Sequence, residues 1–121
     1  MSNYKKLKNR IGFCQNKYLN GVKGDKNKGH YVYIRKVNKD GTCDVNIITS
    51  LEDKNKNITS GKIKQVKKGN TYSLPFYDTN FTRWSGVNKT PIKNVAIEHI
   101  KDIGKKKIKK RHHFFIGKYM K

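Results

Sequence analysis

Five polar side chains of the kinds that cleave RNA without a metal lie close to two apolar segments of the sequence. Lys28 and His30 precede the first segment, while Thr49, Ser50 and Lys54 follow the second. Cleavage of RNA by its own 2′-hydroxyl group needs a base for that hydroxyl and donors that stabilise charge on the phosphorus. These side chains have the chemistry for both roles. The alternative is structural: Thr49 and Ser50 cap a turn, and His30 begins a strand.

The two apolar segments are predicted to be the strands of a hairpin. Residues 31 to 37 and 42 to 48 alternate between apolar and polar side chains, which is the pattern of half-buried strands. Residues 38 to 41 end in Asp-Gly, a typical hairpin turn. Antiparallel pairing around this turn places His30 beside Thr49, so the polar residues of both segments converge at one end of the hairpin.

The two faces of the first strand differ in character. Val32 and Ile34 share one face and are candidates for the core, whereas Tyr31, Tyr33 and Arg35 share the other. Tyrosines on a strand face can stack on unpaired bases while a neighbouring cation holds phosphate. This second face is therefore a candidate surface for nucleic acid.

Two further groups extend the candidate surface. Lys36, like Arg35, is placed to hold phosphate, and residues 80 to 88 bring Arg83 next to Trp84, the only tryptophan. An exposed Trp84 would be a stacking platform for a base. The alternative is that Trp84 anchors the core of a small domain, since large aromatic side chains dominate cores.

The rest of the chain also favours β structure. The 121 residues include 12 Ile, 7 Val, 7 Thr and 13 aromatic residues, against one Ala and four Leu. The other predicted elements are a polar stretch at 51 to 60, strands at 62 to 67 and 72 to 75, an ordered loop at 76 to 91, and a short strand or helical turn at 94 to 100. We therefore expect one domain, residues 1 to 121, folded as a small, mostly β barrel.

The charge of the chain indicates a polyanionic partner. There are 29 Lys and Arg against 8 Asp and Glu, a formal net charge of +21, and both ends of the sequence are basic. Residues 105 to 121 are predicted to form a basic strand or arm that follows phosphates; the alternative is a solubilising tail. Its candidate nucleic-acid contacts are Lys105, Lys106, Lys107, Lys109, Lys110 and Arg111.

Metal, cofactor and membrane functions find no support in the sequence. The four histidines have no carboxylate or cysteine at ligand spacing, and two cysteines make neither a zinc site nor a disulfide framework. No apolar run reaches the length of a transmembrane helix, and no signal peptide is evident. We expect a cytoplasmic protein without metal or cofactor, and no membrane partner.

The order of a basic loop, GHYVYIRKV and CDVNIITS resembles the front half of the MazF/PemK/Kid toxin endoribonucleases and their ToxN relatives, over roughly residues 24 to 54. The resemblance implies a small SH3-like β-barrel, here with basic N- and C-terminal extensions. It implies that Thr49 and Ser50 are the Thr-Ser pair of the cleavage site, that Lys28 or His30 is the loop base or cation, and that Lys54 matches a lysine of ToxN-type enzymes.

The sequence thus predicts a nucleic-acid-binding protein, most specifically a metal-independent toxin endoribonuclease that cleaves single-stranded RNA. The expected partner is RNA in preference to DNA, and the toxin interpretation allows an antitoxin (protein or RNA) and a homodimer. One alternative is a non-catalytic DNA- or RNA-binding accessory protein of a phage, plasmid or integrated mobile element, in which Arg83, Trp84 and the basic C-terminal segment make the contacts. Another is a ribosome-associated barrel protein.

Overall fold

The structure, a computed structural model, describes residues 7–22, 25–52, 55, 57–58, 60–74, 79, 81 and 84–119. In this part of the chain seven strands form one antiparallel sheet that does not close into a barrel, so the fold is mostly β as predicted. The strands are β1 (Ile11–Gln15), β2 (Gly29–Val37), β3 (Thr42–Ser50), β4 (Thr71–Leu74), β5 (Ser85–Asn88), β6 (Ile92–Ala96) and β7 (Ile100–Lys106). The helices are α1 (Ser60–Lys67) and α2 (Lys110–Tyr119), with short 3-10 turns η2 (Asn16–Tyr18) and η4 (Ile97–His99).

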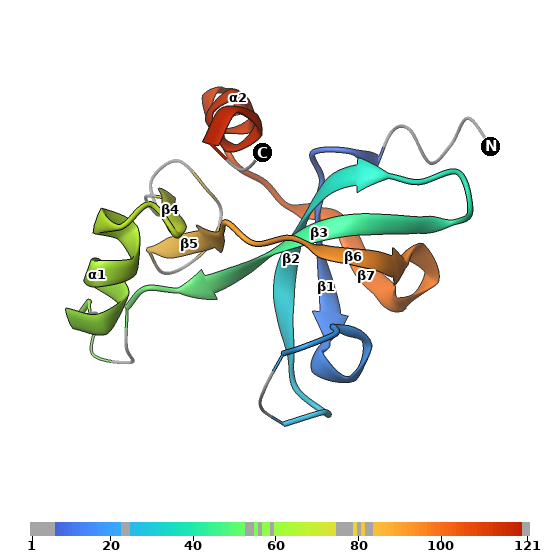
Figure 1. The fold of residues 1–121 in the computed structure, drawn as a ribbon, viewed down its shortest axis with the longest axis horizontal. Helices are drawn as coiled ribbons and strands as arrows, with labels where there is room; N and C mark the ends of the chain where they lie inside the picture. The colour runs from blue at the N-terminus through green and yellow to red at the C-terminus, as the bar shows by residue number, and fades with distance from the viewer. Residues whose placement is uncertain are drawn as a thin grey trace.

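The sheet curves around its two longest strands, β2 and β3 (Figure 1). Its order is β4-β5-β3-β2-β1-β7, and β6 pairs with β3 as well. Strand β3 changes partners along its length, because its first part pairs with β2 and β6 and its last three residues pair with β5. As a result, the start of β2 and the end of β3 lie on different sides of the molecule (Figure 1).

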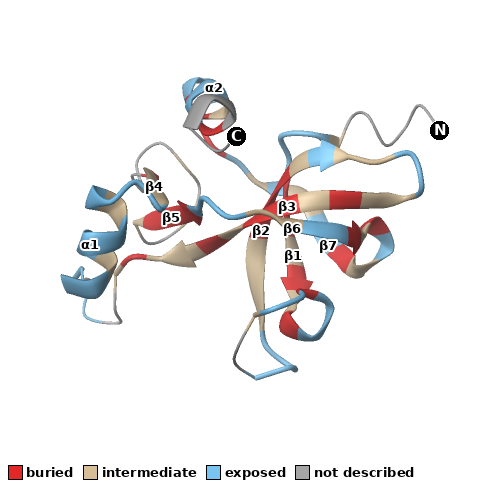
Figure 2. Cartoon of the chain, in the orientation of Figure 1, coloured by how far each residue is buried: buried red, intermediate tan, exposed pale blue. Residues whose placement is uncertain are grey.

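Two clusters of buried side chains fill opposite faces of the sheet, and the buried segments gather where β1, β2 and β3 meet (Figure 2). The first cluster contains Cys14, Leu19, Val32, Ile34, Cys43, Val45, Val95, Ile97 and Ile100. The second includes helix α2 and contains Ile11, Tyr33, Ile48, Leu74, Val87, Ile108 and Ile116. Strand β2 contributes to both clusters, which confirms the predicted alternation of its faces.

The central hairpin forms as the sequence predicts. Its turn is closed by the amide of Asn38, which donates to the carbonyl of Thr42 at 2.9 Å. Gly41 has a φ of 85°, and the Asp40 carboxylate accepts a hydrogen bond from the Thr42 amide at 3.1 Å. The pairing of Tyr31 with Ile48 gives the predicted register.

Residues 62 to 67 belong to helix α1, and the prediction of a strand there is wrong. Ile63 and Val66 are three residues apart and share one helix face, and Lys64 and Gln65 between them favour a helix. The helix ends at a glycine: Gly69, with a φ of 78°, donates to the Val66 carbonyl, and Asn70 donates to that of Gln65. Helix α1 is largely exposed (Figure 2).

The basic C-terminal segment is only partly a strand. Strand β7 ends at Lys106, and α2 occupies Lys110–Tyr119, where we expected a continued strand or arm. His112 and His113 lie four and three residues before Ile116, so all three share one helix face. That face is held against the second cluster, in which Ile116 is fully buried. Tertiary packing here outweighs the strand preference of the adjacent phenylalanines.

The segment predicted as an ordered loop, residues 76 to 91, contains a strand. Within it, β5 places Gly86 against Thr71 and Leu51, where a Cβ atom would collide with the Thr71 side chain. Residues 94 to 100, for which strand and helical turn were both open, contain the end of β6, the turn η4 and the first residue of β7. Neither helix in the described residues is long and apolar enough to cross a membrane.

Candidate nucleic-acid interface

The residues predicted to form a cleavage site at the end of the hairpin pair with two different strands, β1 and β5. The pairs of β2 with β3 from Ile34–Val45 to Tyr31–Ile48 have the predicted register, beyond a bulge between Ile34 and Lys36 near the turn. Beyond Tyr31, His30 pairs with β1 and Thr49 pairs with β5. The ladder between β2 and β3 therefore does not continue to a pair between His30 and Thr49, and the start of β2 and the end of β3 diverge (Figure 1). Lys54, the remaining lysine of this group, lies outside the described residues.

Thr49 and Ser50 lie half-buried at the end of β3. The Ser50 hydroxyl donates to the Glu52 carbonyl at 2.8 Å. The Nζ of Lys62 donates to the Ser50 carbonyl, which ties the strand end to α1. These contacts fit the structural alternative for the Thr-Ser pair.

A hydrogen bond to Asn16 holds His30 near the start of β2. Its Nδ1 lies 2.7 Å from Oδ1 of Asn16, whose Nδ2 donates to the Asp25 carbonyl at 2.9 Å. An amide oxygen only accepts, so His30 donates from Nδ1 and keeps a lone pair on Nε2. Partial burial lowers the pKa of His30. Lys28 is exposed in the same loop, and its carbonyl accepts a hydrogen bond from the amide of Asn16.

The stacking candidates of β2 have different surroundings. Tyr31 is half-buried, but Tyr33 is only 1% exposed and packs in the second cluster, so it presents no face to a base. Arg35 is half-buried and Lys36 is exposed. Of the two predicted tyrosines, Tyr31 alone remains a stacking candidate.

Trp84 is half-buried rather than fully exposed or fully buried. Its amide donates to the Glu52 carboxylate at 2.9 Å, and its ring nitrogen donates to the Ser73 hydroxyl. Trp84 therefore links β4 with the segment that follows β3. Its predicted neighbour Arg83 lies outside the described residues.

Phe13, Tyr31, Phe81 and Lys106 form an aromatic–lysine cluster on the sheet. The Tyr31 ring lies between the other two rings, with centroids 5.4 Å from Phe13 and 5.2 Å from Phe81, both edge-to-face. The Lys106 ammonium lies 5.7 Å from the Tyr31 centroid and 5.6 Å from that of Phe81. All four side chains are half-buried, so each keeps part of its surface accessible.

Lys106 also lines a basic pocket that adjoins this cluster. The cavity has a volume of about 120 Å³ and is lined by Asn9, Arg10, Ile11, Gly104, Lys106, Lys107, Ile108 and His113. These residues come from the start of β1 and the segment before it, the end of β7 and the segment after it, and helix α2. Among the described residues the lining contains no carboxylate, and it includes three basic side chains, Arg10, Lys106 and Lys107.

A bulge in β7 shapes the pocket. Ile11 pairs with Lys106 and Phe13 with Lys101, so a two-residue step on β1 faces a five-residue step on β7. The additional residues include Gly104, whose φ is 89° and which lines the cavity. Bulges of this kind redirect side chains and are common beside functional sites. Here the bulge brings Lys106 next to Ile11, on the same face as the aromatic rings.

The wall of the pocket is tied to the core by a hydrogen-bonded chain. The Tyr33 hydroxyl donates to Oδ1 of Asn9 at 2.9 Å and lies 2.7 Å from Nδ1 of His113. Burial, together with the charges of His112 and Arg10, lowers the pKa of His113. Burial raises the pKa of Tyr33, while the charge of Arg35 acts in the opposite direction. The lowered pKa therefore favours the neutral form of His113 beside the basic side chains of the pocket.

The adjacent histidine anchors the same helix elsewhere. His112 is buried, and its Nδ1 lies 2.7 Å from the Tyr72 hydroxyl on β4. Consecutive histidines of α2 thus contact tyrosines on two strands of the sheet. These contacts fix the rotation of α2 and with it the position of His113.

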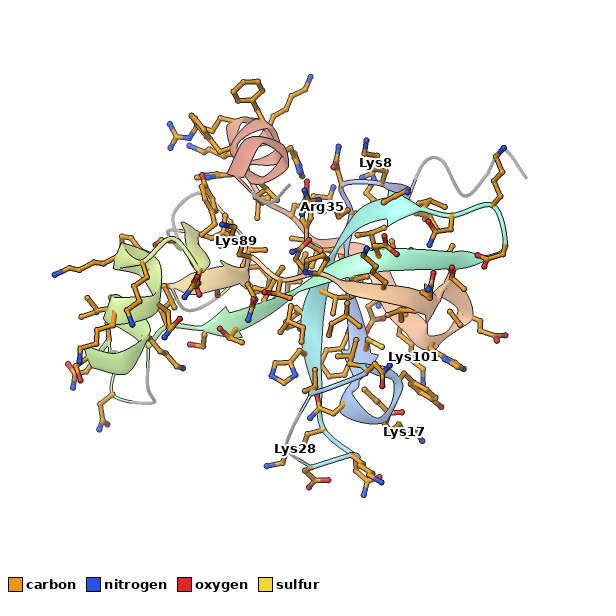
Figure 3. The ribbon with its side chains drawn as sticks, in the orientation of Figure 1. Lys8, Lys17, Lys28, Arg35, Lys89 and Lys101 are labelled. Carbon is orange, nitrogen blue, oxygen red and sulfur yellow. The ribbon has the colours of Figure 1, made fainter. Side chains whose placement is uncertain are left out.

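The remaining candidate cations are distributed more widely. Lys105 forms an ion pair with Asp102 at 3.1 Å, and Lys109, Lys110 and Arg111 are exposed at the start of α2. Figure 3 shows Lys8 and Arg35 near the α2 side of the molecule, whereas Lys17 and Lys28 lie at the opposite end. Cationic side chains therefore lie on several sides of the molecule. The basic pocket is distinguished from these other cations by its cavity and by the neighbouring aromatic rings.

Sequence reasoning missed several members of this interface. Phe13, Phe81, Asn9, Arg10 and His113 were not among the predicted site residues. Nothing in the sequence placed Phe13 or α2 against β2. No family model matches the chain, and no curated protein matches it. Within the described residues, no three His, Cys, Asp or Glu side chains gather as a metal site.

Proposed function

We propose that the protein binds single-stranded nucleic acid, RNA in preference to DNA, on the surface formed by the aromatic–lysine cluster and the basic pocket. The observation that carries this proposal is the position of Lys106, which lies over two aromatic rings and also lines the cavity. Unpaired bases stack on aromatic side chains while cations follow the backbone. One strand of nucleic acid would place a base on the rings and a phosphate in the pocket.

The finer form of the proposal is a metal-independent toxin endoribonuclease that acts in the cytoplasm. It is supported by the resemblance of residues 24 to 54 to the MazF/PemK/Kid family, and the curved sheet is compatible with the SH3-like barrel which that resemblance implies. In this form the partners include an antitoxin, and basic segments flank the barrel. The net charge of +21 favours a nucleic acid as the target.

The binding proposal is tested with a short, fluorescently labelled RNA, the matching DNA and a DNA duplex in anisotropy titrations. Tyr31→Leu and Phe81→Leu keep an apolar side chain but remove the ring. Each should weaken RNA binding by roughly 5- to 150-fold, because stacking contributes about 1–3 kcal/mol per base. Tyr18→Leu is the matched control, since Tyr18 is 36% exposed and stacks on His99 away from the cluster.

The pattern of affinities decides between the proposals. Equal RNA affinity for the wild type and both cluster variants would contradict the assigned surface. Tighter binding of duplex DNA than of single-stranded RNA would instead favour the non-catalytic accessory protein.

A further inference from the structure

We propose that the basic pocket is an RNA-cleaving centre and that His113 is its general base. This inference rests on the proposed binding of single-stranded RNA by the same surface. It assigns catalysis to the segment before β1, the end of β7 and helix α2 instead of the end of the β2–β3 hairpin. Four observations support it: the tautomer of His113, its neutral state, the cations around it and the size of the cavity.

The hydrogen bonds of Tyr33 define the tautomer of His113. The Asn9 Oδ1 only accepts, so the single hydroxyl hydrogen of Tyr33 is donated to it. The Tyr33 oxygen must then accept the hydrogen bond from Nδ1 of His113. His113 consequently carries its proton on Nδ1 and a lone pair on Nε2, which is the form that a general base needs.

The surroundings favour the neutral form of His113 by lowering its pKa. Burial is the main cause of its lowered pKa, followed by the charges of His112 and Arg10. Among the described residues, the titratable or charged groups around it are Arg10 before β1, Tyr33 and Arg35 on β2, Lys106 and Lys107 at the end of β7, and His112 on α2. None of these is a carboxylate that would raise the pKa of the imidazole.

The pocket also has the charge and size to hold a phosphodiester. Arg10, Lys106 and Lys107 line the cavity together with His113. Its volume of about 120 Å³ is roughly four times the volume of one water molecule in the liquid, which accommodates a phosphate group. Guanidinium and ammonium groups stabilise the charge that develops on a phosphoryl centre in the transition state.

The reaction is an internal transfer that needs no co-reactant. Nε2 of His113 removes the proton of a ribose 2′-hydroxyl, and the 2′-oxygen forms a bond to the adjacent phosphorus. The bond from phosphorus to the 5′-oxygen of the next nucleotide breaks, and that oxygen takes a proton from water. The protonated His113 returns its proton to the hydroxide so formed. The products are a 2′,3′-cyclic phosphate and a 5′-hydroxyl, and no electrons are exchanged.

Cleavage of an end-labelled RNA in EDTA tests this assignment, with His113→Gln as the variant and His99→Gln as the matched control. His99 lies at η4, stacked on Tyr18, and lines neither the pocket nor the aromatic cluster. Binding is measured separately on the same RNA with 2′-deoxyribose at the cleaved position. We expect H113Q to cleave at least 100-fold more slowly, the usual contribution of a general base, with affinity within threefold of wild type. H99Q should cleave like wild type.

Two more variants compare this pocket with the hairpin site. The rival assignment, which the resemblance implies, is tested by His30→Gln and by the double substitution Thr49→Ala with Ser50→Ala. Loss of cleavage in either, with H113Q still active, would overturn the assignment to His113. Wild type that binds the RNA but leaves it intact would overturn catalysis and leave the binding proposal standing. Wild type that does not bind RNA would overturn both.

The wild-type pH profile provides a second test that does not depend on the folding of H113Q. A base with a lowered pKa must give a cleavage rate that falls about tenfold per unit of pH below that pKa, which lies under the usual histidine value of about 6.5. A rate that stays constant from pH 7.5 to pH 5 would overturn the role of His113.

Discussion

The hydroxyl of Tyr33 lies 2.7 Å from Nδ1 of His113 and joins the centre of the sheet to helix α2. Tyr33 is almost fully buried, whereas His113 is half-buried at the pocket wall. The hydrogen bond therefore connects the packing of the second cluster with the orientation of a surface imidazole. The core determines which nitrogen of His113 is available to a ligand.

Removal of this hydroxyl should destabilise the protein. Tyr33→Phe leaves Asn9 Oδ1 and His113 Nδ1 without their shared partner, at a cost of about 1–3 kcal/mol in the free energy of unfolding. Tyr31→Phe is the control, because its hydroxyl bonds to no described residue, and it should change stability by less than about 0.5 kcal/mol. Urea unfolding at pH 7.5 measures both. Equal stability of Y33F and wild type would mean that the hydrogen-bonded chain contributes nothing.

The two pocket lysines should account for part of the salt dependence of RNA binding. Replacing Lys106 and Lys107 by Gln removes two cations from the cavity lining. The slope of log K against log salt should become shallower by about 0.7 for each RNA phosphate that the variant no longer neutralises. Lys64→Gln with Lys67→Gln makes the same change of charge on the exposed helix α1 and should leave the slope unchanged. Equal slopes for both double variants would indicate that the charge of the chain acts without a specific site.

Stability should fall as the solution is acidified below neutral pH. Burial lowers the pKa of both His113 and His30 from the usual value of about 6.5, so the unfolded chain binds protons more readily than the folded protein. The contribution of these histidines is complete above about pH 6.5 and is lost as the pH falls toward their folded-state pKa values. Urea unfolding between pH 7.5 and pH 5 should show this decline. It should be shallower in the double variant H30Q/H113Q and retained in H99Q.

Close packing around Gly29 gives a prediction about the backbone. A Cβ at Gly29 would collide with the carbonyl of Cys14 and lie 2.8 Å from the Phe13 ring, so Gly29→Ala must displace β1 or the aromatic cluster. We expect a loss of about 1–3 kcal/mol in stability. Gly61→Ala, in α1 with no atom within 4 Å of the new Cβ, should be neutral or stabilising by up to about 1 kcal/mol. Thermal unfolding of the pair checks the contrast, and a G29A variant as stable as G61A would contradict it.

The sequence predicts the central hairpin well because its signals are local. Alternation over residues 31 to 37, Asp-Gly in the turn and the register at Tyr31 all follow from neighbouring residues. The faces of β2 were assigned correctly by the same alternation. The alternation of apolar and polar residues does not predict where two paired strands separate. Because β3 leaves β2 after Ile48 to pair with β5, the ladder does not extend to a pair between His30 and Thr49.

The candidate pocket could not be predicted because long-range packing assembles it. His113 is 80 residues from Tyr33 in the chain, and the segment that carries it has strand-like composition although it is a helix. Of the interface, only Tyr31 and the basic residues of 105 to 107 could be singled out from the sequence. Lysine and aromatic content indicated the class of ligand, but the location of the pocket depends on how α2 docks.

The bulge of β7 makes the length of this segment more important than the identity of most of its residues. Asp102 and Gly104 both have positive φ angles, and the three additional residues determine that Lys106 arrives opposite Ile11. Deletion or insertion of one residue between 102 and 105 would turn Lys106 to the other face of the sheet, since strand side chains alternate. One such change would remove the lysine from the rings and from the cavity together. Sequence variants of this segment should therefore tolerate many substitutions away from Gly104, but few changes in length.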